Sequence, residues 1–348
     1  MSLHRFLAVL TLAALAACSG PSGDKAKPGG GEQVVNLYTA RHYDSDAQIY
    51  AAFEQETGIK VRRIEAPGPQ LIERMKAEGS SSPADLLIIA DGGSMALAAE
   101  AGLLQPTASP ALEAKVPAHL RDAQDRWFAI SRRARVVAYD SAKVKPEEVD
   151  TYEELASPRF RGKLCVRSAD NPYNLSLMSA LIERWGEARA LAWAKGVVAN
   201  MARPPQGGDI DQIKAVGAGQ CEVAITNSYY YLRLAASQNP ADKALVARVV
   251  LGWPSLGGQG AHVNVSGAGV AAHAPNRANA VRFLEFLLAA QAQRAFADAN
   301  NEFPVVAGTP TSAAVARFAA MPADPLPVAS YGRFQAQAQR IFEEAGWR

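Results

Sequence analysis

The chain contains little cysteine, little histidine and almost no excess charge. Its 348 residues include only three cysteines and five histidines, and 36 basic residues against 34 acidic ones leave a formal net charge of +2. So small a charge creates no basic field for nucleic acid, and we expect no nucleic-acid partner. Because 49% of the residues are hydrophobic, the composition also excludes collagen, a coiled coil and a fully disordered chain. The length corresponds to about two domains.

Motifs of common enzyme classes are lacking as well. The chain has no Gly-x-Ser-x-Gly elbow, no His-Glu-x-x-His pair and no glycine-rich phosphate loop followed by Lys-Ser or Lys-Thr. His4 lies in the N-terminal segment before the apolar run, His119 and His273 lie apart in predicted surface segments, and His262 lies at the edge of a predicted strand. We therefore predict that the protein is not an enzyme.

The N-terminus is predicted to be an export signal. Arg5 supplies a positive start, residues 6–17 form an apolar run, and small residues precede Cys18. The run is shorter than the ~20 residues that span a bilayer, and no later segment is as apolar for ~18 residues. Leu15-Ala16-Ala17-Cys18 is typical of a lipobox, which would make Cys18 the lipidated first residue of the mature protein. The alternative is an ordinary signal peptide in which Cys18 is incidental. Residues 19–32 are predicted to be a flexible tether.

Two cysteines remain after the signal. Export would bring Cys165 and Cys221 into an oxidising compartment, where a disulfide between them is plausible. Spacing alone does not show that they meet, so two buried free thiols remain the alternative.

Short apolar strands alternate with amphipathic helices from residue 33 onwards. This alternation favours an α/β fold with a parallel sheet covered by helices, in two lobes joined by two crossings, the second lobe beginning near Arg133. The strands are predicted at residues 34–38, 59–64, 84–90, 164–167, 222–226 and 263–271. The helices are predicted to start near Asp44 and near Tyr229 and to cover residues 70–78, 94–101, 175–185, 188–200, 209–217, 276–299 and 335–346.

Four tyrosines follow predicted strands at equivalent places. Tyr43 follows the first strand, Tyr173 follows the strand at 164–167, and Tyr229 and Tyr230 follow the strand at 222–226. Ligands of open parallel sheets bind beyond these carboxyl ends of the strands. A phenol has a pKa of ~10, but a bound cation stabilises the phenolate, which suits a hard and highly charged metal ion. His42 would add a nitrogen ligand. The alternative is that these four tyrosines are half-buried residues that only pack against their neighbours and bind no metal.

Several short motifs resemble those of the periplasmic ferric-iron-binding proteins of ABC transporters, in particular their tyrosine-rich cyanobacterial branch. The resemblance covers residues 34–347. Its motifs are Asn36-Leu37-Tyr38, Arg41-His42-Tyr43, Ser82-Pro83-Ala84-Asp85, Arg133-Ala134-Arg135-Val136, Asn171-Pro172-Tyr173-Asn174, Pro205-Gln206-Gly207-Gly208-Asp209, Asn227-Ser228-Tyr229-Tyr230 and His262-Val263-Asn264-Val265-Ser266-Gly267.

The resemblance implies a type II periplasmic-binding-protein fold, with a hinge and an interlobe cleft that holds Fe³⁺. The N-lobe would comprise residues 33–132 and 261–308, and the C-lobe residues 133–260 and 309–348. The implied iron ligands are Tyr43, Tyr173, Tyr229 and Tyr230, and His42 matches a position that ligates in only some members. The family also implies a disulfide between Cys165 and Cys221. Tyr231 is expected to pack rather than to ligate.

Arg133 and Arg233 match cleft arginines of this branch. Four phenolates against three positive charges leave one negative charge, which a guanidinium can offset. Each arginine could instead be a solvated surface residue. A bound anion such as carbonate or citrate is compatible with the site, but a fourth phenolate makes it unnecessary.

The expected partners are an ABC permease and its ATPase, and we expect a monomeric protein, periplasmic or on the cell surface, held at a membrane by Cys18. The competing interpretation is a binding protein for a small organic anion or an iron chelate, which the same cleft, helix N-termini and arginines would serve.

Overall fold

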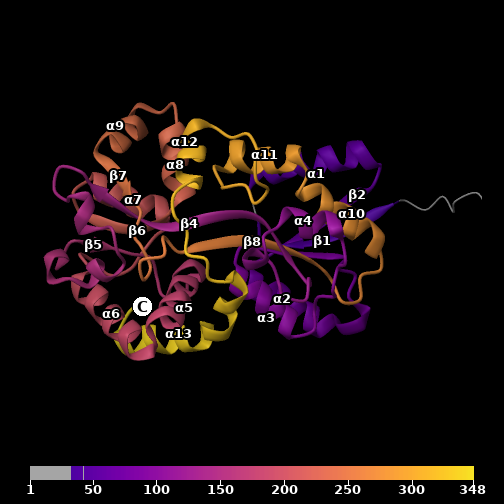
Figure 1. Cartoon of the computed structure of the whole chain (residues 1–348), viewed down its shortest axis with the longest axis horizontal. Coiled ribbons are helices and arrows are strands. Elements are labelled where there is room, and N and C mark those ends of the chain that lie inside the picture. The colour runs from indigo at the N-terminus through magenta and orange to yellow at the C-terminus, as the bar shows by residue number, and fades with distance from the viewer. Residues whose placement is uncertain (1–32, 42) are drawn as a thin grey trace, which may run out of the picture. The chain divides into compact units, whose positions relative to one another are not determined.

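A mixed sheet forms the centre of the protein in the computed structural model, which describes residues 33–41 and 43–348. The sheet has eight strands in the described part, in the order β2-β1-β3-β8-β4-β6-β5, with β7 paired to β4. The strands are β1 (Val34–Thr39), β2 (Lys60–Glu65), β3 (Leu86–Ile89), β4 (Phe128–Asp140), β5 (Leu164–Cys165), β6 (Val223–Asn227), β7 (Val249–Gly252) and β8 (Val263–Val270). Figure 1 shows β4 and β8 crossing the middle of the molecule.

The expectation of a parallel sheet is only partly correct. The strand pairs β1–β2, β1–β3 and β5–β6 are parallel. Every pair that involves β8 or β4 is antiparallel.

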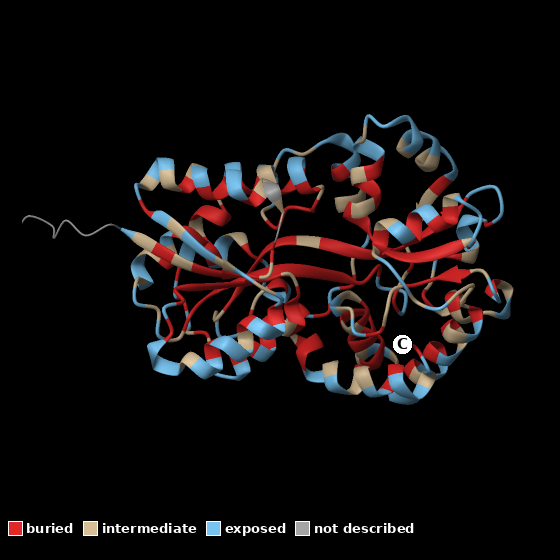
Figure 2. Cartoon of the chain, turned by 180° about the vertical axis from the view of Figure 1, so that it is seen from behind, coloured by how far each residue is buried: buried red, intermediate tan, exposed pale blue. Residues whose placement is uncertain are grey.

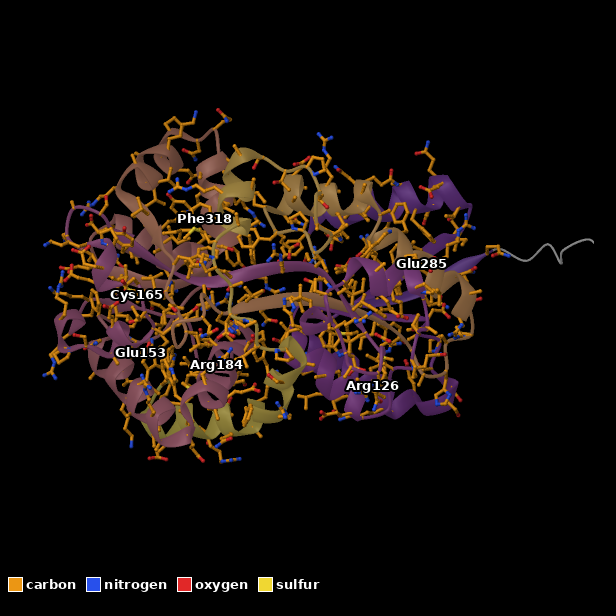
Figure 3. All side chains as sticks on the ribbon, in the orientation of Figure 1. Arg126, Glu153, Cys165, Arg184, Glu285 and Phe318 are labelled. Atoms are coloured by element: carbon orange, nitrogen blue, oxygen red, sulfur yellow. A yellow bond between two sulfur atoms is a disulfide. The ribbon has the colours of Figure 1, made fainter. Side chains whose placement is uncertain are left out.

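Helices cover both faces of this sheet. The helices of the first half are α1 (Asp44–Thr57), α2 (Gly68–Glu78), α3 (Gly92–Glu100), α4 (Pro110–Lys115), α5 (Pro172–Trp185) and α6 (Glu187–Asn200). Those of the second half are α7 (Asp209–Gly217), α8 (Ser228–Ala236), α9 (Pro240–Arg248), α10 (Arg277–Leu287), α11 (Ala290–Asn300), α12 (Ala313–Ala319) and α13 (Tyr331–Ala345). In Figure 2 the strands are buried along most of their length while the helices expose their outer faces, and Figure 3 shows side chains filling the space between the layers. The described residues include no helix long and apolar enough to cross a membrane.

Most predicted elements are confirmed within a few residues, and local signals explain their ends. Helix α1 ends at Gly58, which adopts the left-handed conformation with φ of 72° that glycine tolerates without strain. The start of α1 at Asp44 confirms the expectation, and the N-cap residue, Tyr43, makes no side-chain capping bond.

The single helix predicted at residues 276–299 is wrong. The chain forms α10 and α11, and Ala289 between them is extended with φ of −75° and ψ of 153°. The buried Gln293 side chain donates to the Leu287 carbonyl at 2.8 Å and to the Ile130 carbonyl at 2.7 Å. A tertiary contact thus takes up a carbonyl at the end of α10, and no glycine or proline marks the break in the sequence.

Strand β4 belongs to two parts of the sheet. Its first half, up to Ala134, pairs with β8, and its second half, from Arg135, pairs with β6 and β7. Helix α13 packs against α5 and α6 and also against α3. The predicted lobe boundaries at residues 132/133, 260/261 and 308/309 remain a prediction.

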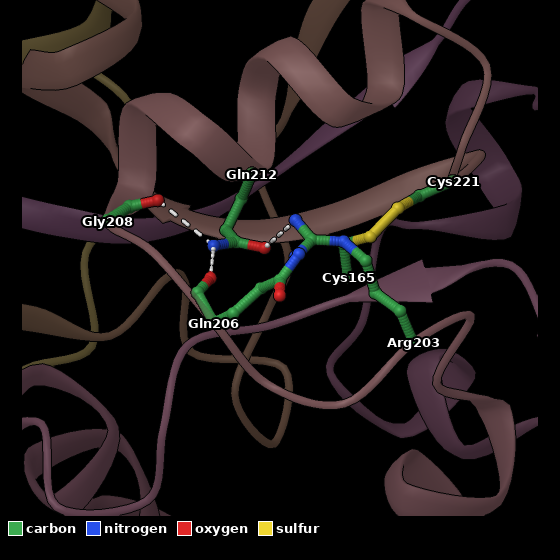
Figure 4. Close-up of a disulfide and its surroundings, with 6 residues drawn as sticks. All are labelled: Cys165, Arg203, Gln206, Gly208, Gln212 and Cys221. Carbon is green, nitrogen blue, oxygen red and sulfur yellow. Dashed lines mark hydrogen bonds between the residues drawn. A yellow bond between two sulfur atoms is a disulfide. The ribbon is translucent and has the colours of Figure 1, made fainter.

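Cys165 and Cys221 form a disulfide, with Cα atoms 5.9 Å apart. The bond joins β5 to Cys221, two residues before the start of β6, next to the ladder in which Cys165 pairs with Ala224. Figure 4 shows the disulfide beside the loop before α7, where the Gln212 side chain donates to the carbonyls of Gln206 and Gly208. The alternative of two free thiols is therefore wrong. Cys18 lies outside the described residues.

Candidate functional site

Three tyrosine hydroxyl groups from distant parts of the chain meet at one point. The hydroxyl oxygen of Tyr229 lies 3.3 Å from that of Tyr43 and 3.4 Å from that of Tyr173. The ring of Tyr230 packs against that of Tyr229 with centroids 4.2 Å apart. The structure thus brings together all four tyrosines that the sequence singled out.

Each tyrosine stands at the N-terminus of a helix, beyond the end of a strand. Tyr43 directly precedes α1, Tyr173 is the second residue of α5, and Tyr229 and Tyr230 are the second and third residues of α8. At α5 the Asn171 side chain accepts the backbone N–H of Tyr173 at 3.0 Å, and Pro172 occupies the first turn. These residue types favour a helix start at this point, which places Tyr173 in the helix rather than in the loop that we predicted.

Burial makes the free phenols hard to ionise. Burial and nearby charges raise the pKa of Tyr230 to about 12. The largest effect is burial, and the next is the charge of the nearby Tyr173. The pKa of Tyr229 lies well above its ordinary value, because this residue is fully buried and three other tyrosines surround it. Burial and the charge of Glu302 also raise the pKa of Tyr43. These three hydroxyls are therefore protonated at neutral pH, and only a strongly charged cation would stabilise them as phenolates.

The two predicted arginines both approach the tyrosines. The Cζ atom of Arg133 lies 5.5 Å from the centre of the Tyr173 ring, and that of Arg233 lies within 6.0 Å of the rings of Tyr43, Tyr229 and Tyr230. Arg133 is only 2% exposed, so the surface alternative is wrong for this residue. Arg233 is half-buried and stands four residues after Tyr229 and three after Tyr230, which places all three on one helix face.

Further charged residues near the tyrosines were missed from the sequence. Arg135 and Arg167 also approach Tyr173, at 5.9 Å and 5.6 Å from its ring centre. The spacing of Arg133 and Arg135 was the available signal, because alternate residues of a strand share one face. On the other side, the Arg41 guanidinium lies 4.8 Å from the Tyr43 ring and forms buried ion pairs with Asp46 and Glu302 at 2.7 Å and 2.9 Å. Nothing local to Glu302 indicated this proximity.

Other expectations about the site have mixed outcomes. Tyr231 packs in the hydrophobic cluster that contains Cys165 and Cys221, as expected for a residue outside the site. His42 lies outside the described residues, so its role stays a prediction. Among the described residues, no group of three or more His, Cys, Asp or Glu could hold a metal ion.

A family of known proteins matches most of this chain. The match covers residues 48–323, and the family is described as the bacterial extracellular solute-binding proteins. The chain belongs to this family. Membership implies a periplasmic location for this solute-binding protein and an ABC transporter as its partner.

Named relatives of this solute-binding protein are associated with iron. It is 45% identical to the iron uptake protein A1 of Synechocystis sp. over 344 residues, which cover 99% of this chain and 96% of the relative. It is 29% identical to the major ferric iron-binding protein of Neisseria meningitidis serogroup B, over 78% of this chain and 80% of that one.

Solved structures confirm the fold class of this solute-binding protein, an α/β periplasmic-binding-protein fold. The FutA protein of Trichodesmium, solved in complex with iron and citrate ligands, superposes with a TM-score of 0.85 and is 46% identical, covering 90% of this chain and all of that one. The ferric binding protein from Campylobacter jejuni also gives a TM-score of 0.85, at 39% identity, over 90% of this chain and all of that one. The names of these relatives refer to iron uptake and iron binding rather than to catalysis.

Proposed function

We propose that this protein captures ferric iron through Tyr43, Tyr173, Tyr229 and Tyr230 and delivers it to an ABC permease driven by an ATPase. The observation that carries the proposal is the position of the Tyr229 hydroxyl oxygen, which lies 3.3 Å from that of Tyr43 and 3.4 Å from that of Tyr173. Phenolate oxygen is a hard anionic ligand, which suits a hard trivalent cation. The iron-associated names of relatives with 45% and 46% identity support the same cargo.

Binding exchanges protons for iron. Each phenol that ligates Fe³⁺ releases its proton to solvent, because only the phenolate is a strong ligand. With all four phenolates bound, the site carries a net charge of −1 before the arginines are counted. Arg133, only 2% exposed, and Arg233, within 6.0 Å of three tyrosine rings, would offset that charge. We assign them this electrostatic role and no role as ligands.

Iron would also hold two parts of the fold together. Tyr43 follows β1, whereas Tyr173, Tyr229 and Tyr230 follow β5 and β6 at the other end of the sheet order. A cation shared by both groups would stabilise the closed arrangement. We place the two groups in the proposed N-lobe and C-lobe, and we propose His42 as a fifth ligand. An anion can join the site, but the four phenolates do not require one.

We further propose that the mature protein is monomeric and attached to a membrane by lipid on Cys18, with residues 19–32 as a tether. The lipobox-like sequence Leu15-Ala16-Ala17-Cys18 supports this attachment. A Cys18→Ala variant is expected to lose its place in the membrane fraction, and its continued sedimentation with membranes would contradict the anchor.

A ferric chelate is the second candidate cargo. A cavity of about 380 Å³ lies beside the site and is lined by Tyr173, Ser94, Gln335 and residues at the starts of α2 and α3. The Trichodesmium neighbour contains iron together with citrate. Organic oxygen donors could occupy this cavity while the phenols hold the metal.

Titration of the chelator-stripped protein with ferric iron tests the proposal. We expect a visible phenolate-to-iron charge-transfer band that saturates at one equivalent, and no such band with Zn²⁺. Tyr229→Phe combined with Tyr230→Phe should abolish the band. Tyr231→Phe is the matched control, since Tyr231 is the next residue but packs in a hydrophobic cluster. A folded wild-type protein without a band would overturn the proposal.

Titrations with citrate distinguish an iron-dependent site from a site for an organic anion. Calorimetric titration with citrate alone, with ferric iron alone and with ferric citrate is expected to give tight binding only where iron is present. Tight binding of metal-free citrate would instead favour the organic-anion interpretation.

A further inference from the structure

A buried arginine links the two segments that carry the C-terminal tyrosines. Arg135 is the first residue of the β4 half that pairs with β6, where it lies opposite Asn227. Its side chain is 1% exposed and forms an ion pair with the equally buried Asp209, with Nη1 and Oδ2 2.7 Å apart. Asp209 is the first residue of α7. The Arg135–Asp209 pair is therefore buried inside the protein.

The guanidinium of Arg135 reaches the start of both tyrosine-bearing helices. Its Nη2 donates to Oδ1 of Asn174 at 2.8 Å, and its Nη1 donates to Oδ1 of Asn227 at 3.1 Å. Asn174 directly follows Tyr173, and Asn227 is two residues before Tyr229. The Arg135 guanidinium thus bonds to Asn174, next to the proposed ligand Tyr173 on α5, and to Asn227, close to the proposed ligand Tyr229 on α8.

The acceptors of Arg135 are themselves held in place. Asn174 donates through Nδ2 to the carbonyls of Arg167 and Ser168 at 3.2 Å and 2.9 Å, which ties α5 to the loop after β5. The Oδ2 atom of Asp209 also accepts the backbone N–H of Asn227 at 2.7 Å. The network therefore spans the ends of β5 and β6 and the starts of α5, α7 and α8.

We infer that Arg135, together with Asp209 and Asn174, is a positioning residue that sets the distance and angle between Tyr173 and the Tyr229–Tyr230 pair. This inference rests on the proposed iron site. Arg135 is not a ligand, because its Cζ atom lies 5.9 Å from the Tyr173 ring centre and its two Nη atoms bond to the asparagines and the aspartate. The rigid fork of guanidinium can bond several acceptors in one plane, whereas the single ammonium of lysine cannot hold the same set.

Arg135→Lys separates geometry from charge, because the positive charge beside Asp209 is kept. We expect iron to bind still, with a shifted or weakened charge-transfer band and dissociation into a competing chelator faster by about tenfold. Asn174→Ala should give the same change, since it removes the bond from Arg135 to α5, together with the Asn174 bonds to the Arg167 and Ser168 carbonyls, while leaving the Arg135–Asp209 pair intact. Circular dichroism and thermal unfolding report whether each variant is folded. If Arg135→Lys does not fold, the Asn174→Ala variant tests the inference.

A double-mutant cycle with Tyr173→Phe decides whether the effect acts through the ligand. If Arg135 positions Tyr173, Arg135→Lys and Asn174→Ala should change iron dissociation by less than about twofold once Tyr173 is already phenylalanine. Equal effects with and without the Tyr173 hydroxyl would overturn the inference, because they would indicate general destabilisation. A wild-type protein without an iron band would instead refute the proposed function itself.

Arg184→Lys is the matched control for these variants. Arg184, labelled in Figure 3, lies near the other end of α5 and forms a two-bond pair with Asp324 at 3.0 Å and 2.6 Å. It resembles Arg135 in being an arginine paired to a buried aspartate, but both of its hydrogen bonds go to Asp324 and neither involves a tyrosine of the site. We expect Arg184→Lys to leave the band and the dissociation rate unchanged, and a change equal to that of Arg135→Lys would count against the inference.

Discussion

The hydroxyl oxygens of Tyr43 and Tyr229 lie 3.3 Å apart although 186 positions separate the two residues in the sequence. Their rings meet edge to face, with centroids 6.4 Å apart. The contact joins the helix that follows β1 to the helix that follows β6, and these strands lie far apart in the sheet order. This one contact connects the two sets of proposed ligands.

Tyr43→Phe should weaken iron binding while leaving the fold intact. The change removes the one proposed phenolate ligand that follows β1, whereas the other three follow β5 and β6. We therefore expect the affinity for iron to fall by at least about tenfold. Equilibrium competition with a ferric chelator measures this loss. Tyr50→Phe is the control on the same helix, because Tyr50 is buried and packs on Phe283. Equal losses in the two variants would show that Tyr43 is not a ligand.

Iron affinity should decrease as the pH falls. Burial raises the pKa of Tyr43, Tyr229 and Tyr230, so these groups are protonated in the free protein throughout the neutral range and must lose protons when iron binds. Each released proton makes the apparent binding constant fall by about tenfold for each pH unit of acidification. Competition titrations between pH 6 and pH 8, with buffered chelators of known pH dependence, would give the number of protons released. A slope of zero would mean that neutral groups hold the iron.

Removing a positive charge near the tyrosines should lower the affinity for iron. A unit charge about 6 Å away contributes on the order of 3 kcal/mol at an effective dielectric constant of ~20, so Arg133→Met should reduce binding by roughly a hundredfold. Arg233→Met should have a smaller effect, because Arg233 is only half-buried and solvent screens its charge.

Arg294→Met is the control for these arginines. Arg294 pairs on the surface with Asp298 at 3.0 Å, and its side chain is 65% exposed. The chelator competition should show no change in this variant. If Arg133→Met behaved like Arg294→Met, the proposed charge balance would be wrong.

Loss of the disulfide should lower the free energy of unfolding. Cys165 and Cys221 enclose a sequence separation of 56 residues, and closing a loop of this size contributes about 2 to 4 kcal/mol. Urea denaturation of the Cys165→Ser, Cys221→Ser double variant, compared with the oxidised wild-type protein, measures the difference. Wild-type protein treated with a reductant should approach the variant. If the midpoints of unfolding coincide under oxidising conditions, the bond does not stabilise the native state.

Local patterns predicted most elements because their signals lie within a few residues. Gly58 ends α1, and Asn171-Pro172 starts α5. The missed break at Ala289 has a different origin, since it depends on Gln293 bonding to carbonyls of α10 and β4. The same holds for the two-residue strand β5, which was expected to be longer and which ends after pairing with only two residues of β6.

The residues of the candidate site also fall into two groups, those that the sequence predicts and those that only tertiary contacts reveal. Four tyrosines at the ends of strands could be found from the sequence, because the order of strand, tyrosine and helix is local information. The spacing of Arg133 and Arg135 could have placed Arg135 on the face of Arg133, but the contacts of Arg135 with Asp209 and Asn174 are tertiary. The ion pair between Glu302 and Arg41 is also tertiary, and no local pattern indicates it.

By itself, the sequence determined the kind of ligand that the protein can offer and the local structures that present it. Phenol groups, helix starts and apolar strands are properties of single residues and their nearest neighbours. The tertiary structure alone decided that Tyr229 meets Tyr43 and Tyr173 and that Arg135 joins the starts of α5 and α8. The reason is physical, because the pairing of strands and the packing of helices fix distances between residues that the chain itself leaves free.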